Sequence, residues 1–406
     1  MKIVENIEGR FARWAQSPMV LRSISQVLRE VAPVTKVGSN LFVFKYQDVV
    51  DTLTADVDFG VTPTYAAKMH RTSGTFFLGM EDGPRYRKEQ AFARKGFLSG
   101  DEKRLSELTR QNARALLEPL RKRGRFDFVS DYAARIPLAI VRDYFGVPGP
   151  TPQTLQRWLG DLFWELFLNF TDETAVRERA ANAADEMRPY LLGRIAQIRA
   201  SGGEDNFLGR LVAARDEPNS GMDDLSVVRN IGGVIIGAMS TQAKAMTLAL
   251  EELLRRPDVL VKAREAALSD DDELLSGYIF EALRFNPHNP LVVRHAMRPC
   301  EVAPGTPHAR TVDTGDQVFA MTISASFDAK GFLDPLKFDH TRKYEDYLHF
   351  GYGMHRCFGA RVVKQVLTAA LKEVLVLERL TSVVRAGAAV SYIGPYPSSF
   401  KVRFMR

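Results

Sequence analysis

Residues 349–360 read His-Phe-Gly-Tyr-Gly-Met-His-Arg-Cys-Phe-Gly-Ala, so one cysteine is framed by three glycines, aromatic residues and two histidines. A cysteine ligates a metal only as its thiolate, and a helix N-terminus favours that charge because unpaired amides and the helix dipole point toward it. The segment after Cys357 predicts such a helix, because apolar residues from Val362 to Leu375 recur at the i, i+3, i+4 spacing. We therefore interpret Cys357 as a metal ligand.

The residues around this cysteine suit a flat, iron-bearing macrocycle such as heme. Gly351 and Gly353 let the backbone lie close to a ring and adopt positive φ angles. Phe350 is expected to cover the ring, while His355 and Arg356 offer donors or positive charge to anionic propionates. A lone cysteine is more often a small buried hydrophobe, and its neighbours are what favour the ligand interpretation here.

The same run resembles the heme-binding signature of the cytochrome P450 family, Phe-Gly-x-Gly-x-His-x-Cys-x-Gly, at every fixed position from Phe350 to Gly359. The resemblance implies that Cys357 is the axial heme-iron ligand and that Gly359 and Ala360 contact the heme. It also implies a single domain over residues 1–406, mainly α with small β-sheets (α+β). In that triangular, prism-like fold the heme lies between a long oxygen-binding helix and the helix after the cysteine.

Further landmarks of the family occur upstream in the expected order. Glu281-Ala282-Leu283-Arg284 resembles its Glu-x-x-Arg motif, a pair that alone would be ordinary surface decoration. Phe338-Asp339-His340-Thr341-Arg342 resembles the segment that would place Arg342 beside Glu281 and Arg284 in a buried structural triad. Pro290–Arg294 resembles the segment whose arginine reaches a heme propionate, which implies that Arg294 is a cofactor contact.

The longest helical pattern runs from about Leu225 to Arg255, after capping candidates Asp223 and Asp224 and before Pro257. The resemblance identifies this segment as the oxygen-binding helix. Short strands are expected around residues 37–44, from about Gln317 to Ile323, and near the C-terminus.

The chain departs from the family within this long helix. The usual Ala/Gly-Gly-x-Asp/Glu-Thr segment falls on Gly237-Ala238-Met239-Ser240-Thr241, so the threonine is present and the acid is absent. In the family the acid and the alcohol help to deliver the protons that oxygen activation consumes. Thr241 and Ser240 remain the catalytic candidates, Ala238 a heme contact, and Gln242 a residue that organises water. The alternative for both hydroxyls is a bond to the preceding helical turn.

A second departure lies in the segment Asp82–Gln90. The family's pattern here is Asp-Pro-Pro-x-His-x-x-x-Arg. This chain has Tyr86 in place of the histidine and Gln90 in place of the arginine. Both are expected to bind a heme propionate, but neither brings charge. Charge neutralisation would then depend on Arg294 and His355.

The substrate pocket is specified less well. An aromatic-rich stretch, residues 158–170, falls where the family places its pocket lid. An apolar, fairly large substrate is the modest inference, against the alternative that such aromatics belong to the core. The residues expected to line the pocket are Phe76, Phe77, Phe167, Gly237, Leu291, Val292, Val293 and Ile393.

Composition limits the cellular setting. Hydrophobic residues make up 45% and charged residues 26% of the chain, as in a soluble globular protein. Neither a long apolar run nor an apolar leader within residues 1–8 is present, so we expect no membrane anchor. The two cysteines, Cys300 and Cys357, indicate no disulfide framework and favour a cytoplasmic protein.

The basic balance, 55 Lys and Arg against 49 Asp and Glu, does not indicate a nucleic-acid partner, because no basic run with interleaved aromatics occurs. The resemblance instead implies a docking face for ferredoxin or flavodoxin, which with its reductase passes on electrons from NAD(P)H. We expect a monomer. The basic residues near that face are Arg85, Arg87, Lys88, Arg94, Lys95, Arg356, Arg361 and Lys364.

Three functions remain open from the sequence. The first is a heme b monooxygenase that inserts one atom of O2 into an apolar small molecule, by hydroxylation or epoxidation. The second is a heme-thiolate enzyme that uses peroxide or rearranges its substrate without external electrons, which the missing acid at Ser240 favours. The third, an inactive binding or recruitment module, is opposed by the intact signature around Cys357.

Overall fold

The computed structural model describes residues 18–169, 171–384 and 389–405. Residues 1–8 and Phe170 of the expected lid therefore lie outside the described part. The chain divides into two compact units, so the single domain expected over residues 1–406 stays a prediction. Unit 1 comprises Met1–Gly60, Lys244–Cys357 and Leu375–Met405, and unit 2 comprises Val61–Ala243, Phe358–Val374 and Arg406.

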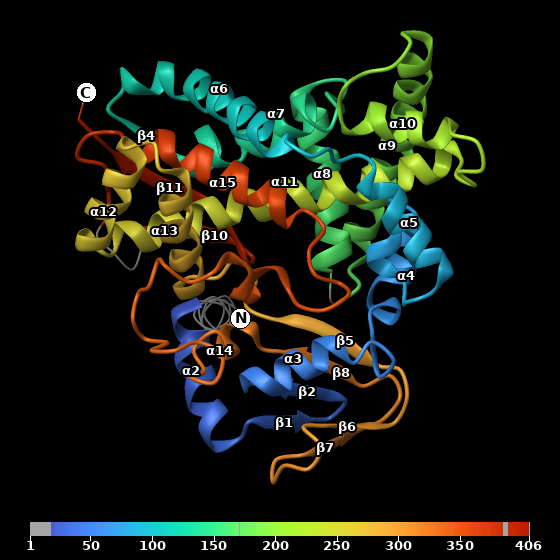
Figure 1. The fold of residues 1–406 in the computed structure, drawn as a ribbon, viewed down its shortest axis with the longest axis vertical. Coiled ribbons are helices and arrows are strands. Elements are labelled where there is room, and N and C mark those ends of the chain that lie inside the picture. The colour runs from blue at the N-terminus through green and yellow to red at the C-terminus, as the bar shows by residue number, and fades with distance from the viewer. Residues whose placement is uncertain (1–17, 170, 385–388, 406) are drawn as a thin grey trace, which may run out of the picture. The chain divides into compact units, whose positions relative to one another are not determined.

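Unit 1 contains a five-stranded sheet with the strand order β1-β2-β8-β5-β3 (Figure 1). Its strands are β1 (Val34–Val37), β2 (Asn40–Val43), β3 (Phe59–Gly60), β5 (Val292–Ala296) and β8 (Gln317–Ala320). The short strands expected around residues 37–44 are present as the β1–β2 hairpin, with Gly38 at a φ of 59° in its turn. Strand β2 pairs with β8 in parallel and the other pairs are antiparallel. Leu41, Val43 and Val318 are fully buried and belong to one hydrophobic core cluster.

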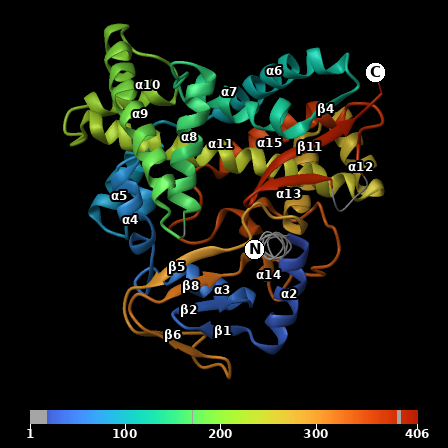
Figure 2. The same ribbon diagram turned by 180° about the vertical axis from the view of Figure 1, so that it is seen from behind.

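The other elements of unit 1 are helices and short hairpins (Figures 1 and 2). The helices are α2 (Pro18–Val31), α3 (Tyr46–Thr54), α12 (Pro257–Leu268), α13 (Asp272–Phe285) and α14 (Thr322–Ala325), and the remaining strands are β6 (Cys300–Val302), β7 (Arg310–Val312), β9 (Thr381–Ser382), β10 (Val390–Ile393) and β11 (Tyr396–Arg403).

Strand β8 is shorter than the sequence predicts. The strand was expected to reach Ile323, but β8 ends at Ala320, and the amide of Ile323 donates to the carbonyl of Pro290 instead.

Unit 2 is mostly helical, and both views show α8 and α9 lying side by side (Figures 1 and 2). Thr151 caps α8 by accepting a bond from the amide of Thr154, and Pro152 occupies the first turn, where its missing N–H is harmless. The elements are α4 (Thr62–Arg71), α5 (Pro84–Arg94), α6 (Asp101–Arg121), β4 (Arg125–Asp127), α7 (Arg135–Asp143), α8 (Pro152–Phe167), α9 (Thr174–Ala200), α10 (Phe207–Asp216) and α15 (Ala360–Leu375), whose last residue belongs to unit 1.

Helix α11 (Asp224–Leu254) is the longest of these elements at 31 residues, as the sequence predicts. Asp223 caps it, because its carboxylate accepts a hydrogen bond of 2.7 Å from the amide of Ser226. The helix begins in unit 2 and ends in unit 1, with the division between Ala243 and Lys244. The prediction of a mainly α fold with small sheets is confirmed. None of the helices in the described ranges combines the length and apolarity that crossing a bilayer requires.

Candidate functional site

The loop before Cys357 has a fixed shape. Gly351 and Gly353 adopt φ angles of 70° and 74°, in the left-handed region that favours glycine. The amide of Cys357 then donates to the carbonyl of Phe350 at 2.8 Å, which folds the loop back on itself. Cys357 is exposed, and α15 begins three residues later at Ala360, as predicted. The loop therefore presents an accessible sulfur close to a helix N-terminus.

The two glycines of this loop have different surroundings. A Cβ atom on Gly353 would lie 2.5 Å from the carbonyl oxygen of Leu53 in α3, whereas a Cβ on Gly351 would have no neighbour closer than 4.0 Å. Gly351 is therefore required for its backbone angle. Gly353 is required for its angle and for the close approach of α3.

We expect Gly353→Ala to destabilise the protein by about 2 kcal/mol or more, because the new methyl group combines left-handed strain with a backbone clash. Urea unfolding followed by circular dichroism measures this change. Gly193→Ala is the matched control, since Gly193 is exposed within α9 and nothing in the described part lies within 4 Å of its Cβ position. That control should gain about 0.5–1 kcal/mol. Equal stability of the two variants would contradict the steric argument.

Aromatic rings surround the start of the cysteine loop. Phe350 is 6% exposed and its ring lies 5.5 Å from Tyr344 and 6.1 Å from Phe280, measured between centroids. Burial, followed by the nearby Cys357 charge, raises the pKa of Tyr344, so this phenol stays neutral. His355 and Arg356 lie in the same loop and are partly buried, Gly359 lies in the turn before α15, and Ala360 is the first residue of that helix. An accessible thiol and a backbone with two positive φ angles fit an axial ligand to heme.

Arg294 lies in β5 and is 4% exposed. Its Nη1 donates to the carbonyl of Val293 at 3.0 Å, and its neighbour across the sheet is Val318 of β8. A buried guanidinium favours a bidentate carboxylate partner, which a heme propionate provides. In unit 1, Cys357 thus fits the iron of a heme, and Arg294 fits a heme propionate.

The structure brings Glu281, Arg284 and Arg342 together, all within unit 1. Glu281 and Arg284 are fully buried and form two bonds, Nη2 to Oε1 at 2.6 Å and Nε to Oε2 at 3.0 Å. The Nε atom of Arg342 lies 3.6 Å from Oε1 of Glu281. Sequence reasoning missed the hydroxyl of Tyr347, which donates to Oε2 of Glu281 at 2.9 Å. Several donors therefore compensate one buried carboxylate.

Arg284 also ties two other chain segments, at residue 326 and at residues 335–337, to α13. Its Nη1 donates to the carbonyl oxygens of Ser326 at 2.9 Å and Pro335 at 2.8 Å, and its Nη2 donates to that of Lys337 at 3.0 Å. The side chain thus organises the segment that leads to the cysteine loop.

The oxygen-side candidates lie on α11. The hydroxyl of Thr241 donates to the carbonyl of Gly237 at 2.5 Å, so it bonds to the preceding helical turn. Ser240 is partly buried, and its hydroxyl makes no hydrogen bond within the described residues. Gln242 is 2% exposed, and its Oε1 has no partner among the described groups. No described atom lies within 4 Å of a Cβ built on Gly237, so space is open beside this turn.

Tyr86 and Gln90 lie one turn apart on α5. The Nε2 of Gln90 donates to the hydroxyl of Tyr86 at 2.6 Å, so the two residues in the expected propionate positions form a neutral pair. Between them, Glu89 is 4% exposed and accepts bonds from Asn230 at 2.5 Å and Arg229 at 3.1 Å. This buried carboxylate fixes α5 on α11, and the sequence pattern gave no signal for it.

The residues expected to line the substrate pocket fall in both units, and their role stays a prediction. In unit 2, Phe76 and Phe77 are buried, and a Cβ on Gly233 would lie 2.3 Å from the Phe76 ring. Phe167 is partly buried, with its ring 5.8 Å from that of Tyr65. In unit 1, Leu291, Val292 and Val293 are partly buried, whereas Ile393 is 67% exposed at the end of β10.

A buried polar cluster joins α4 to α8. Glu165 is fully buried and accepts bonds from Arg71 at 2.8 Å and from Asn169 at 2.6 Å. Lys68 donates to the carbonyl of Asn169 at 2.9 Å, and burial lowers the pKa of this lysine. We call Glu165, Arg71, Asn169 and Lys68 the α4–α8 clasp.

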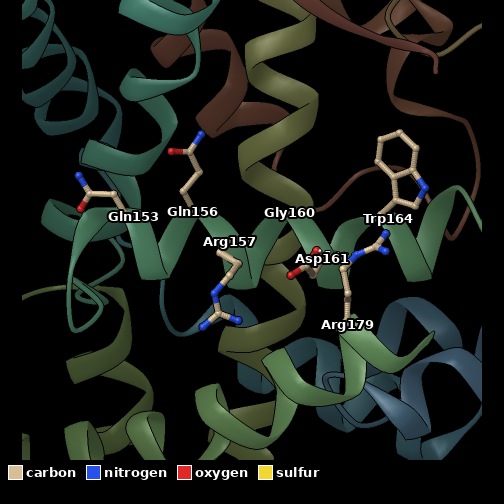
Figure 3. Close-up of a pocket in the computed structure, with 7 residues that line it drawn as sticks. All are labelled: Gln153, Gln156, Arg157, Gly160, Asp161, Trp164 and Arg179. Atoms are coloured by element: carbon tan, nitrogen blue, oxygen red, sulfur yellow. Dashed lines mark ion pairs between the residues drawn. The ribbon is translucent and has the colours of Figure 1, made fainter. Parts of the chain in front are cut away.

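A hollow of about 400 Å³ lies on the surface of α8 and α9 (Figure 3). Its walls carry an ion pair of 3.4 Å between Asp161 and Arg179. None of the residues expected in the heme site or substrate pocket lines it. The lining residues are Gln153, Gln156, Arg157, Gly160, Asp161, Trp164 and Arg179.

The expected basic face is only partly available for docking. Arg85, Arg87, Lys88 and Arg94 are exposed on α5, and Lys95 follows at its end. Ion pairs with Asp82 and Glu217 neutralise Arg87 and Lys95, respectively. Arg361 on α15 is exposed, while Arg356 and Lys364 are partly buried.

Known proteins resemble this chain in sequence. The family model described as Cytochrome P450 matches residues 38–377. The chain is 27% identical over 365 residues to mycinamicin IV hydroxylase/epoxidase of Micromonospora griseorubida, a match that covers 88% of this chain and 87% of that protein. It is 27% identical over 352 residues to erythromycin C-12 hydroxylase of Saccharopolyspora erythraea, covering 86% and 84%.

Solved structures show the same fold. CalO2 matches with a TM-score of 0.83 at 22% identity, over 94% of this chain and 95% of that chain. The enzyme CYP109B1 from Bacillus subtilis matches with a TM-score of 0.80 at 21% identity, over 96% and 100%.

Proposed function

Because the chain belongs to the cytochrome P450 family of heme-thiolate monooxygenases, we propose that it hydroxylates or epoxidises an apolar organic substrate with electrons from a separate redox partner. For a hydroxylation, substrate C–H, O2, two electrons and two protons yield C–OH and water. The observation that carries the proposal is the accessible Cys357 in its glycine-shaped loop, close to the N-terminus of α15.

The chain's own residues hold the cofactor and handle protons. Heme, when bound, supplies the redox chemistry that splits O2 and transfers one of its atoms to the substrate. Cys357 would hold the iron, and Arg294 and His355 would hold propionates, with Tyr86 and Gln90 as neutral donors. On α11, the Thr241 hydroxyl and the unpartnered Oε1 of Gln242 would hold water and pass protons.

The substrate proposal rests on the aromatic and aliphatic residues around the expected pocket and on the relatives' activities. Those relatives are named as a hydroxylase/epoxidase and a C-12 hydroxylase, which supports C–H or C=C oxidation. The exposed arginines and lysine of α5 support a ferredoxin or flavodoxin as electron donor, supplied by NAD(P)H through a reductase. The monomeric state and cytoplasmic location stay predictions from the sequence.

The residue before Thr241 gives one reason to consider the peroxide-using or rearranging alternative. Position 240 of α11 carries a serine, which has no carboxylate to exchange protons with water. Electron-driven turnover would then form product less efficiently per electron than in a protein with the acid.

Turnover with two oxidant systems tests the proposal. We expect reductase, ferredoxin and NAD(P)H to support at least about tenfold faster product formation than hydrogen peroxide, and Ser240→Asp to raise product formed per NAD(P)H consumed. Ser240→Asn is the matched control, because asparagine is similar in size to aspartate but has no exchangeable carboxyl proton. Equal rates in the two systems, with no gain from the aspartate, would favour the peroxide or rearrangement chemistry.

A further inference from the structure

Two histidines of unit 1 lie beside the start of the cysteine loop. The centroid of the His349 ring lies 6.2 Å from that of His288. Both rings are also near the ring of Phe350, at 6.2 Å from His349 and 6.3 Å from His288. His349 stacks in addition on Tyr347, at 4.9 Å between centroids. The two imidazoles therefore support the aromatic residue that begins the loop leading to Cys357.

Neither ring has an acidic partner. The Nε2 of His349 donates to the carbonyl oxygen of Phe280 at 3.0 Å, its one hydrogen bond within the described ranges. The Nδ1 of His288 is buried and has no partner among the described residues. His308 differs, because its Nε2 lies 2.9 Å from the carboxylate of Asp48. A proton added to His288 or His349 would therefore gain no bond to a carboxylate.

Burial and nearby positive charges keep both imidazoles neutral. Burial, followed by His349 and the charge of Lys244, lowers the pKa of His288 from the ordinary 6.5 to about 3. Burial lowers the pKa of His349 to about 4, where Arg284 adds to the effect and the bond to Phe280 opposes it. His349 is 5% exposed, whereas His288 keeps more of its surface exposed.

The other titratable groups packed near the pair do not offset an added proton. The carboxylate of Glu281 is already held by Arg284 and by the hydroxyl of Tyr347. Tyr344 and Tyr347 stay neutral, because burial raises the pKa of both phenols. Two charged imidazoles would thus place uncompensated positive charge among buried aromatic rings, which costs free energy.

We propose that the His288–His349 pair is an acid-sensitive latch on the cysteine loop. When both imidazoles take up solvent protons, their rings leave the aromatic surroundings, and Phe350 loses its support. The loop then no longer presents the thiolate of Cys357 to a heme. The inference rests on the heme site of the family and is independent of the substrate and oxidant of the proposed function.

Acid should open the latch within a defined range of pH. In the unfolded chain a histidine takes up its proton near pH 6.5, whereas the folded pair stays neutral down to about pH 4 for His349 and about pH 3 for His288. The unfolded chain therefore binds more protons in this range, so the stability is fully present above about pH 6.5 and falls as the pH falls. Each histidine should lower the folded-to-unfolded ratio by up to about tenfold per pH unit, and the pair by up to about a hundredfold.

Acid titration of the heme-loaded protein tests the latch, with the absorption band of thiolate-ligated heme as the readout. In the double variant, His349→Gln keeps a donor for the carbonyl of Phe280, and His288→Leu fills the space with an apolar group. We expect the wild type to lose the band between about pH 6 and 4, and the double variant to lose it about one pH unit lower or more. His70→Gln, at an exposed histidine of α4, is the matched control and should follow the wild type. Protonation of the thiolate itself contributes equally in all three proteins.

Nuclear magnetic resonance of the wild type is a second test that needs no variant. The sample is the reduced, carbon monoxide-bound protein with ¹³C-labelled histidine, which is diamagnetic. The imidazole signals of His288 and His349 should not titrate between pH 7.5 and 5.5, whereas free histidine in the same buffer titrates near 6.5. This measurement also applies if the double variant does not fold.

Three outcomes would overturn the inference: an imidazole signal of His288 or His349 that titrates near pH 6.5 in the folded protein; the same acid midpoint in the double variant and the wild type; or an equal shift in His70→Gln. Each of them leaves turnover with O2 and electrons near pH 7.5 untouched. Conversely, a latch that behaves as expected in a protein that forms no product would reject the proposed function alone.

Discussion

Cys357→Ala should abolish thiolate ligation and reduce monooxygenase activity to background. The thiolate is the expected axial ligand, and alanine offers no atom that binds iron. The reduced, carbon monoxide-bound absorption band of thiolate-ligated heme should therefore disappear. Because Cys357 is exposed, the substitution should change the stability of the heme-free protein by less than about 0.5 kcal/mol. Lost ligation can thus be separated from lost folding.

Cys300→Ala is the control for this experiment. Cys300 lies in β6, is partly buried, and has a thiol pKa raised by that burial, so it is a poor thiolate donor. We expect its spectrum and activity to match those of the wild type. A thiolate-type spectrum retained in Cys357→Ala, or lost in Cys300→Ala, would refute the axial assignment.

Arg284→Met should have the largest effect on stability, about 3–5 kcal/mol, because it leaves the carboxylate of Glu281 buried without its main partner. That loss is a large fraction of the roughly 5–15 kcal/mol that stabilises a typical protein. It also removes the bonds to the carbonyls of Ser326, Pro335 and Lys337, which hold the segment leading to the cysteine loop. The heme-loaded fraction after expression and the urea unfolding midpoint both measure this effect.

An exposed ion pair provides the comparison. Arg87→Met breaks the pair with Asp82, in which both side chains are substantially exposed at 69% and 46%. Such pairs contribute about 0–1 kcal/mol, so this variant should remain folded and heme-loaded. If Arg284→Met were no more destabilising than Arg87→Met, the buried triad would not be the structural centre that its geometry suggests.

Local patterns made much of the fold predictable. The apolar periodicity, the capping candidate Asp223 and the helix-stopping Pro257 predicted the bounds of α11 to within one residue. The apolar spacing after Cys357 likewise predicted α15. Strand β8 was predicted too long because an apolar run does not show where a chain leaves its neighbouring strand, which depends on partners distant in sequence.

The site was predictable where motif residues carry the chemistry, and not where contacts between distant segments create it. Tyr347 reaches Glu281 across 66 positions, and Glu89 reaches Asn230 across 141. Tertiary structure decides such contacts, and no spacing within either segment indicates them.

The α4–α8 clasp has a kinetic consequence. Separating the two helices would remove Arg71 from the buried carboxylate of Glu165, at roughly 3 kcal/mol, the lower end for a buried pair because Arg71 keeps 39% of its side chain exposed. Because the other contacts of the two helices add to that cost, no more than about one molecule in a hundred would be open at any moment. A ligand that leaves between α4 and α8 would wait for this rare opening. Its residence time would then depend on the clasp as well as on its own affinity.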